Sequence, residues 1–176
     1  AGDAGEFCVR PTQSFQIFNG YFENPEAEQA AFIGDWYHTG DLGMQDGEGN
    51  YFFLDRKKDL IRYKGRNVSS VQVESIAQQH PAVVGAAAYA VKSDELESED
   101  EIKLDVILQA GVSITAPELA RHVNDHAPYF CVPRYINFVE ELPYTPTNKV
   151  QKYKLRLQPV AANVWDRTKS DFQLER

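Results

Sequence analysis

Three short segments of the chain concentrate side chains that can contact a nucleotide or a phosphate. The first is YHTGDLG, residues 37–43, in which Gly40 and Gly43 flank Asp41 and let the backbone approach a ligand closely. A carboxylate placed there can accept hydrogen bonds from both hydroxyls of a sugar diol. The alternative is a turn in which Asp41 bonds its own backbone, and the segment taken alone favours that turn.

The second segment is basic within an acidic chain. Residues 55–67 (DRKKDLIRYKGRN) place arginines and lysines around a single glycine, Gly65. Basic side chains and open backbone N–H groups suit contact with a phosphate or a nucleotide, because both ligands need donors at close range. A solvated strand edge protected by lysines has the same composition. The residues alone leave both interpretations open.

The third segment is LPYTPTNKVQKYKLR, residues 142–156. Pro143 and Pro146 restrict the backbone just before Lys149, which would hold a point charge steady for catalysis. A proline-containing surface loop followed by a basic helix is the alternative, and these residues alone favour it.

Histidines and cysteines give no comparable signal. His122 and His126 have a spacing that permits a metal pair on a helix, but the Glu placement of a zinc hydrolase is missing, so we predict a solvated helix face. Cys131 is predicted to be a small buried thiol. Because Cys8 and Cys131 lie far apart without a CxxC pattern, we predict neither a disulfide nor a metal site, and a reducing, cytoplasmic setting.

Composition narrows the class of protein. The chain has 176 residues, is 43% hydrophobic and 25% charged, and carries a formal net charge of -8. These values fit a globular protein and argue against disorder and against a nucleic-acid binder that coats phosphates. The longest apolar stretch, residues 83–91, is too short to span a bilayer, and no export signal is visible. Because the chain starts at Ala1 and enters a strand-like GEFCVR directly, we expect a fragment or a processed chain.

The elements that would position these segments fall into two parts. Residues 1 to about 55 predict hairpins, with strand-like runs at 5–10 and 15–18, turns at 19–20 and 46–50, and a short helix at 25–32. Two hairpins bury little surface, so we expect this part to belong to a larger domain.

The second part alternates strands and helices in a compact α+β unit. Ser69 with Gln72, and Thr115 with Glu118, resemble capping boxes that begin helices. The predicted elements are a helix ending before Pro81, strands at 83–91 and 103–108 separated by a solvated acidic loop at 93–100, a helix to about residue 127, and a strand at 135–139.

The order of the three segments, with Val73-Glu74 between the second and the third, resembles the last third of adenylate-forming (AMP-binding) enzymes. That superfamily includes acyl-CoA synthetases, luciferases and the adenylation domains of peptide synthetases. The YKGRNVSS stretch and the residues 128–156 are most similar to acyl-CoA synthetases, in the branch of carnitine/crotonobetaine-CoA ligases. The resemblance implies that residues 1–57 are the β-hairpin end of a large N-terminal domain and that residues 58–176 are a mobile α+β C-terminal domain.

The resemblance also implies a carboxylate-CoA ligase that uses ATP with Mg²⁺, forms acyl-AMP and pyrophosphate, and transfers the acyl group to coenzyme A with release of AMP. It assigns ribose contacts to Asp41 and Arg56, the domain hinge to Lys58, the CoA channel to Gly65 and Phe130, and catalysis of the first step to Lys149. A lysine ammonium placed between the attacking carboxylate and the α-phosphate offsets their mutual repulsion.

Two positions depart from the family pattern. Many CoA ligases have a basic residue where this chain has Val132, which puts phosphate contacts to CoA on that side in doubt, and Asp is common where Lys58 stands. The phosphate loop, the adenine-binding motif and the acyl pocket precede the region matched here, and the Mg²⁺ ligands are expected outside this chain. The chain alone is therefore expected to be inactive without its N-terminal domain or chain, and the acid is left open. The alternatives are an adenylation domain serving a carrier protein and a non-catalytic interaction module.

Overall fold

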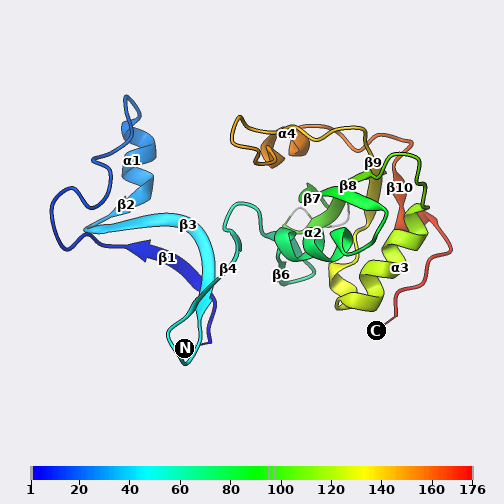
Figure 1. Cartoon of the computed structure of the whole chain (residues 1–176), viewed down its shortest axis with the longest axis horizontal. Helices are drawn as coiled ribbons and strands as arrows, with labels where there is room; N and C mark the ends of the chain where they lie inside the picture. Colours follow the sequence, from blue (N-terminus) through cyan, green and yellow to red (C-terminus); the bar gives the residue numbers. More distant parts are fainter. Residues whose placement is uncertain (1, 95, 97, 176) are drawn as a thin grey trace. The chain divides into compact units, whose positions relative to one another are not determined.

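The computed structural model describes residues 2–94, 96 and 98–175 and divides the chain into two compact units, Ala1–Lys58 (unit 1) and Asp59–Arg176 (unit 2) (Figure 1). The resemblance implies a boundary one residue earlier, after residue 57. In the described residues no helix is long and apolar enough to cross a membrane.

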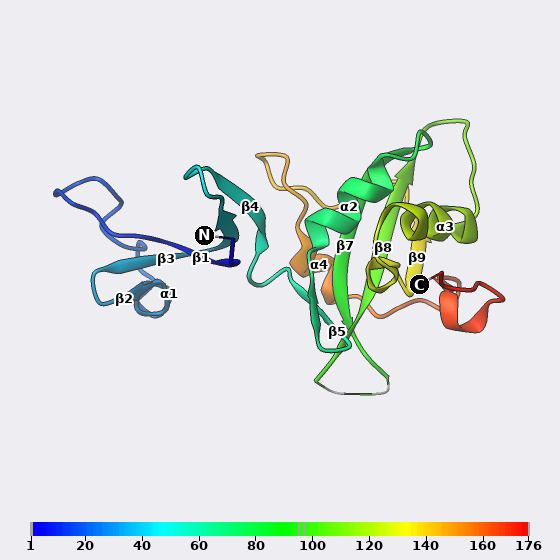
Figure 2. The same ribbon diagram turned by 90° about the horizontal axis from the view of Figure 1, so that it is seen from below.

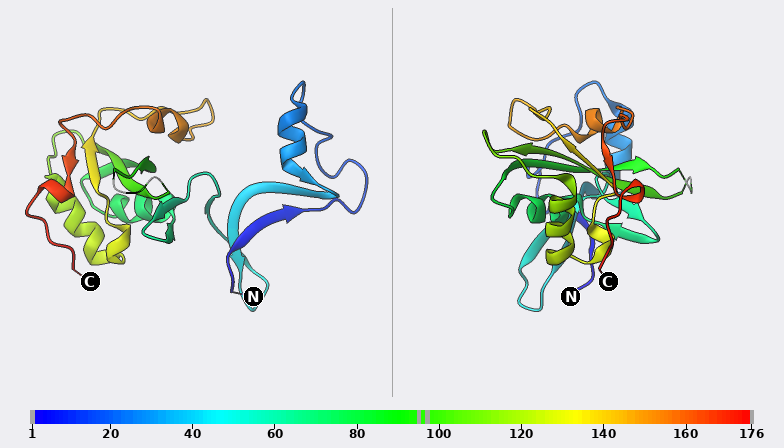
Figure 3. Two further views of the ribbon diagram at one scale, coloured as in Figure 1. Left: turned by 180° about the vertical axis from the view of Figure 1, so that it is seen from behind. Right: turned by 90° about the vertical axis from the view of Figure 1, so that its right-hand side faces the viewer.

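Unit 1 is an antiparallel sheet built around one long strand. Its elements are β1 (Gly5–Val9), α1 (Pro25–Ala31), β2 (Phe32–Ile33), β3 (Trp36–Gln45) and β4 (Tyr51–Arg56). β3 pairs with β1, β2 and β4, and Figure 3 shows β1 running beside it. The predicted turn at 46–50 joins β3 to β4, with Asp46 Oδ1 accepting hydrogen bonds from the backbone of Glu48 and Asn50. α1 begins after Asn24, whose side chain accepts from Ala27 N.

One predicted part of unit 1 is wrong. Residues 15–18 form no strand, because Phe15 has φ 66°, which a β-strand does not accommodate. The Gln16 side chain instead accepts from the backbone N–H groups of Thr12 and Gln13 and closes a local turn. Aromatic residues are typical of strands, and this composition predicted one here. Phe15 is instead 88% exposed.

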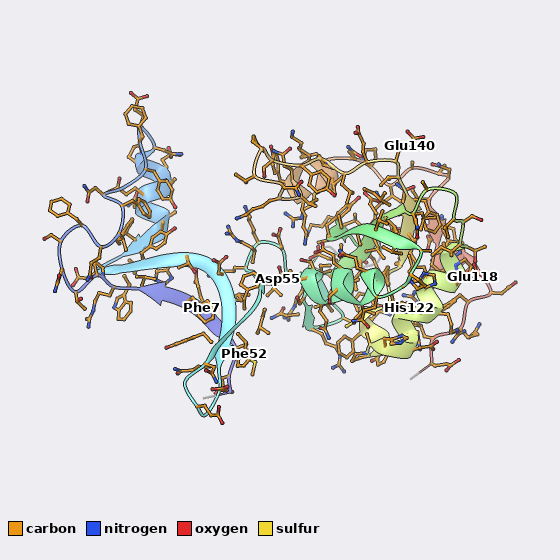
Figure 4. All side chains as sticks on the ribbon, viewed as in Figure 1. Phe7, Phe52, Asp55, Glu118, His122 and Glu140 are labelled. Carbon is orange, nitrogen blue, oxygen red and sulfur yellow. The ribbon has the colours of Figure 1, made fainter. Side chains whose placement is uncertain are left out.

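Unit 1 has almost no buried interior. Among its described residues only Gly43 and Asp55 are buried. A Cβ at Gly43 would collide with the Phe7 ring and with the Phe52 carbonyl oxygen, so the glycine permits the close approach of β1 and β4 to β3 beside a shift in the β3–β4 register (Figure 4).

Unit 2 is the α+β fold that the sequence predicts. Its described elements are β5 (Ile61–Tyr63), β6 (Arg66–Val68), α2 (Ser70–Gln78), β7 (Val83–Lys92), β8 (Asp100–Leu108), α3 (Ala116–His126), a 3₁₀ turn (Tyr129–Cys131), β9 (Tyr135–Phe138), α4 (Lys152–Arg156), β10 (Trp165–Asp166) and a second 3₁₀ turn (Arg167–Lys169). The main sheet has the order β10-β9-β8-β7, and β5 and β6 form a separate hairpin. β8 and β9 are parallel and are joined through α3.

The helices of unit 2 cover both faces of the main sheet. α2 and α3 pack on the face that carries Ala88 and Leu104, whereas Leu142 and Leu155 pack on the opposite face against Ala87 and Tyr89. Figure 2 shows α2 and α3 beside the sheet, and Figure 3 shows α4 across it. The segment that contains Lys149 therefore lies on the face of the main sheet that is opposite α2 and α3.

The predicted caps explain where the two longer helices begin. Ser69 Oγ accepts from Gln72 N at the start of α2. At the start of α3 the Thr115 side chain accepts from Glu118 N, and the Glu118 carboxylate accepts from Thr115 N at 2.7 Å, which completes the capping box.

Candidate functional site

Asp41 and Arg56 lie opposite each other on β3 and β4 and form an ion pair. Arg56 Nε is 2.6 Å from Asp41 Oδ1, and both side chains are partly exposed. Thr39 Oγ1 accepts a hydrogen bond from Asp41 N, so the backbone of Asp41 is satisfied by a neighbour. The turn that we favoured from residues 37–43 alone is thus wrong, because these residues belong to β3. A carboxylate beside a guanidinium offers both acceptors and donors to a hydroxylated ligand.

Glu6 fixes the backbone that precedes Asp41. Its Oε1 accepts from Gly40 N at 3.0 Å, and its Oε2 lies 3.2 Å from His38 Nδ1 and 3.1 Å from Lys57 Nζ. The hydrogen bond to His38, followed by that to Lys57, lowers the pKa of the Glu6 carboxyl. The sequence reasoning missed Glu6, since its partners are 32 or more positions away.

Cys8 adds a thiol to the same network. Cys8 Sγ is 3.5 Å from His38 Nδ1, so Glu6, Cys8 and His38 form a possible metal-ligand group in the part of the chain that the structure describes. We predicted no metal site from the sequence. The Lys57 ammonium beside Glu6 disfavours a cation there, and hydrogen bonds account for the contacts of all three side chains.

Lys58 lies in an exposed turn with a tethered residue on each side. Lys57 N donates to Gly40 O at 2.8 Å within unit 1. Asp59 pairs with Arg156 of α4 within unit 2. The ordered contacts of both units therefore reach the immediate neighbours of Lys58.

Arg66, the residue after Gly65, lies over the ring of Phe130 in unit 2. Gly65 lies at the tip of the β5–β6 hairpin with φ 76°, where nothing occupies the space around a Cβ, so the backbone conformation is what favours glycine. The guanidinium carbon of Arg66, the next residue, is 4.8 Å from the centre of the Phe130 ring. One face of that ring is thus covered by a cation that also carries planar donors.

Lys149 extends from a closed loop on the sheet face described above. Thr145 N donates to Lys149 O at 2.8 Å, and Lys149 N donates to Thr145 Oγ1 at 3.0 Å. Lys152 anchors the following helix through Glu74 Oε1 and Ser70 Oγ, each at 2.7 Å. These contacts, together with the prolines, hold the exposed Lys149 side chain on a fixed backbone.

The prediction of a solvated face holds for His126, which is exposed, but not for His122, and the cysteine prediction is confirmed. His122 (labelled in Figure 4) is half-buried, and its ring contacts His80 edge to face and the tilted ring of His126. Its Nε2 lies 3.0 Å from Ile76 O. Burial lowers the pKa of His122. Cys131 is buried, and burial raises the pKa of its thiol to about 11, which disfavours a nucleophilic thiolate.

Val132 stands where many CoA ligases have a basic residue, and the nearest cation on the other side of Pro133 is Arg134. Val132 is buried, and Arg134 follows with ion pairs to Asp94, Glu101 and Asp166. The positive charge next to this proline is therefore neutralised inside unit 2.

Comparison with known proteins shows which enzymes this chain is similar to. Residues 72–149 match the AMP-binding enzyme C-terminal domain. Crotonobetaine/carnitine–CoA ligase from Salmonella arizonae is 32% identical over 88% of this chain and 30% of the relative. Acyl-coenzyme A synthetase ACSM5, mitochondrial, from Homo sapiens is 38% identical over 89% of this chain and 28% of the relative.

A solved structure gives the same result. The anthranilate CoA ligase AuaEII in complex with anthranoyl-AMP superposes with a TM-score of 0.78 at 32% identity, over 89% of this chain and 30% of that one. The chain spans less than a third of the length of each of these proteins. Residues 72–149, in unit 2, belong to the AMP-binding enzyme C-terminal domain, and the chain as a whole is similar to the C-terminal part of adenylate-forming enzymes.

Proposed function

We propose that this chain is the C-terminal portion of an ATP-dependent carboxylate-CoA ligase. The observation that carries the proposal is the Asp41–Arg56 ion pair on two adjacent strands, in a chain whose curated relatives are CoA ligases. The carboxylate of Asp41 accepts hydrogen bonds from the two hydroxyls of the ATP ribose. Arg56 orients that carboxylate and donates to a ribose oxygen.

Lys149 serves the first half-reaction. A carboxylate oxygen of the acid attacks the α-phosphorus of ATP, the bond to the β-phosphate oxygen breaks, and pyrophosphate leaves. Negative charges approach one another in this transition state, so an ammonium already in place stabilises it. The loop bonds between Thr145 and Lys149 hold the backbone below that ammonium.

The β5–β6 hairpin and Phe130 serve the second half-reaction. The CoA thiol loses its proton, its sulfur attacks the acyl carbon, and the bond to the AMP phosphate oxygen breaks. Gly65 leaves room for the pantetheine arm, because the space around its missing Cβ is open. Arg66 and Phe130 offer a cation and a ring surface to the adenine of CoA. Between the two steps unit 2 rotates about Lys58, so that the β5–β6 hairpin replaces Lys149 at the reacting groups.

Unit 1 needs a larger partner for this function. Its exposed aromatic side chains include Phe15, Phe22, Phe52 and Phe53. Apolar surface of this extent is typical of an interface, and the rest of a large AMP-binding domain would cover it. We propose that ATP phosphates, Mg²⁺ and the acyl group bind mainly to that domain, so that the chain alone is inactive. Two free cysteines are compatible with a reducing cytoplasm.

An adenylation domain serving a carrier protein is the alternative. The ring–guanidinium pair of Phe130 and Arg66 favours a nucleotide-bearing thiol over a bare phosphopantetheine arm, since the adenine of CoA is what a ring surface recognises. This pair therefore favours the ligase.

The test starts from the native protein that contains this chain, purified with any polypeptide bound to it and checked by intact mass. It is incubated with ATP, Mg²⁺ and a panel of fatty, aromatic and carnitine-like carboxylates. We expect pyrophosphate release with at least one acid, and an acyl-CoA product only when CoA is added. Acyl transfer to a phosphopantetheinyl protein but not to CoA would support the carrier-protein alternative, and absence of acyl-AMP would contradict both.

A further inference from the structure

The tip of the β5–β6 hairpin has a backbone that needs support. Lys64 and Gly65 both have positive φ, 48° and 76°, as in the two-residue turn that matches the twist of a hairpin. Lysine has a side chain that disfavours this left-handed region by about 1–2 kcal/mol. The tip is therefore strained at Lys64, and a contact that holds the turn from outside the hairpin offsets part of this cost.

Glu99 supplies such a contact from the acidic loop. Gly65 N donates to both carboxylate oxygens of Glu99, each at 3.2 Å. A hydrogen bond from a backbone N–H to an ionised carboxylate is stronger than one between neutral groups. The carboxylate thus binds the backbone in the conformation that the strained turn requires.

The loop that carries Glu99 is itself closed by hydrogen bonds. Ser93 N donates to Glu99 O at 3.2 Å, and Glu99 N donates to Leu96 O at 3.1 Å. The next residue, Asp100, accepts from Arg62 N at 3.3 Å and pairs with Lys92 at 3.0 Å. Two consecutive carboxylates therefore hold the same hairpin, one at its tip and one along β5. The loop predicted to be merely solvated has a structural task.

We propose that Glu99 is a positioning residue for thioester formation, which holds the Lys64–Gly65 tip in the conformation that lines the path of the CoA thiol. The inference rests on the proposed function. Glu99 and Gly65 both belong to unit 2, so the contact persists when that unit rotates about Lys58. The first half-reaction, which uses Lys149 on a different loop, does not depend on this contact.

Three variants distinguish loss of the hydrogen bond to Gly65 from loss of the negative charge, and both from the effect of removing any surface glutamate. Glu99→Ala removes the acceptor, and Glu99→Gln keeps an amide oxygen that can still accept from Gly65 N. Glu140→Ala is the matched control, because Glu140 is exposed on unit 2 (Figure 4) and forms no hydrogen bond or ion pair with another described residue.

The first readout is amide hydrogen exchange of Gly65, measured by NMR on the whole 176-residue chain. We expect Glu99→Ala to speed this exchange about 10-fold, the effect of losing one hydrogen bond to a charged group. Glu99→Gln should lie between wild type and Glu99→Ala, and Glu140→Ala should match wild type. Unchanged Gly65 exchange in Glu99→Ala would overturn the proposal.

The second readout is the rate of each half-reaction in the native ligase. We expect Glu99→Ala to slow thioester formation from preformed acyl-AMP about 10-fold while adenylation stays within about 2-fold of wild type. Glu99→Gln should restore much of the thioester rate. Equal slowing of both steps, or a normal thioester rate in Glu99→Ala, contradicts a positioning role while the ligase function stands. A wild-type protein that forms no acyl-CoA with any acid contradicts the proposed function itself, and the inference with it.

Discussion

The two units hold their candidate site residues in different ways. In unit 2, Lys149, Gly65 and Phe130 lie on loops and turns attached to a sheet with buried side chains on both faces. In unit 1, Asp41 and Arg56 lie on strands of which the described residues bury only Gly43 and Asp55. Their geometry depends instead on polar contacts centred on Glu6.

This difference indicates that unit 2 has the buried interior of an independent domain, whereas the described residues of unit 1 form no such interior. A sheet without an apolar interior cannot offset the loss of chain entropy by itself. Several aromatic residues of unit 1 are exposed instead of packed into an interior. Matched substitutions in the two units should therefore differ in their effects.

The largest contrast should appear in stability. Leu104 is fully buried in unit 2, and Leu104→Ala is expected to lower the free energy of unfolding of the chain by about 2–5 kcal/mol. Phe52 of unit 1 is 48% exposed, so Phe52→Ala should change it by less than about 0.5 kcal/mol. Denaturant unfolding of the chain measures both values. Similar losses in the two variants would break the comparison.

The next effect concerns the nucleotide. Asp41→Asn removes the charge that Arg56 pairs with and weakens the acceptor for the ribose hydroxyls. We expect AMP affinity of the native ligase to fall about 10- to 100-fold, as for a hydrogen bond to a charged group. Calorimetry measures this affinity, with Asp3→Asn, an exposed site of unit 1, as the control. Wild-type affinity in Asp41→Asn would remove unit 1 from the nucleotide site.

A smaller effect is expected at the link between the units. Lys58→Pro fixes φ near -65° and should slow thioester formation about 10-fold more than adenylation, because only the second step requires rotation. Lys58→Ala removes the same side chain without fixing φ and is the matched control. Rapid-quench experiments measure the rates of adenylation and of thioester formation. A wild-type rate of thioester formation in Lys58→Pro would exclude a hinge at this residue.

The smallest effect is a pH dependence of unit 2. Burial lowers the pKa of His122, so the unfolded chain binds the proton more readily than the folded one. The contribution of His122 to stability is therefore complete above the ordinary pKa of about 6.5 and is lost as the pH falls below it. Because the ring is partly exposed, the loss should be below about 1 kcal/mol. Denaturant midpoints at pH 8 and 5.5 should converge in His122→Gln, and an unchanged pH dependence there would assign the effect to other groups.

Local signals explain which parts of the fold the sequence could predict. The caps at Ser69 and Thr115 and the apolar runs of β7 and β8 specify their elements within a few residues, and the structure confirms them. The run at 15–18 has the composition of a strand, but the positive φ of Phe15 prevents one.

Long-range pairing explains what the sequence could not predict about the site. Asp41 and Arg56 are singled out by the resemblance, but their ion pair follows from the register of β3 and β4. Glu6 reaches its partners only because β1 lies against β3. Glu99 had no signal beyond an acidic run, and its role depends on a loop that folds back toward Gly65.

The measurement that tests the central claim most directly is the rate of each half-reaction in Lys149→Ala of the native ligase. If Lys149 neutralises charge in the first step, acyl-AMP formation should fall about 100- to 1,000-fold, as when a group that stabilises transition-state charge is removed. Thioester formation from preformed acyl-AMP should remain within about 3-fold of wild type, since that step uses the hairpin at Gly65. An equal loss in both half-reactions, or no loss in adenylation, would contradict the assignment of this chain to the C-terminal portion of a working carboxylate-CoA ligase.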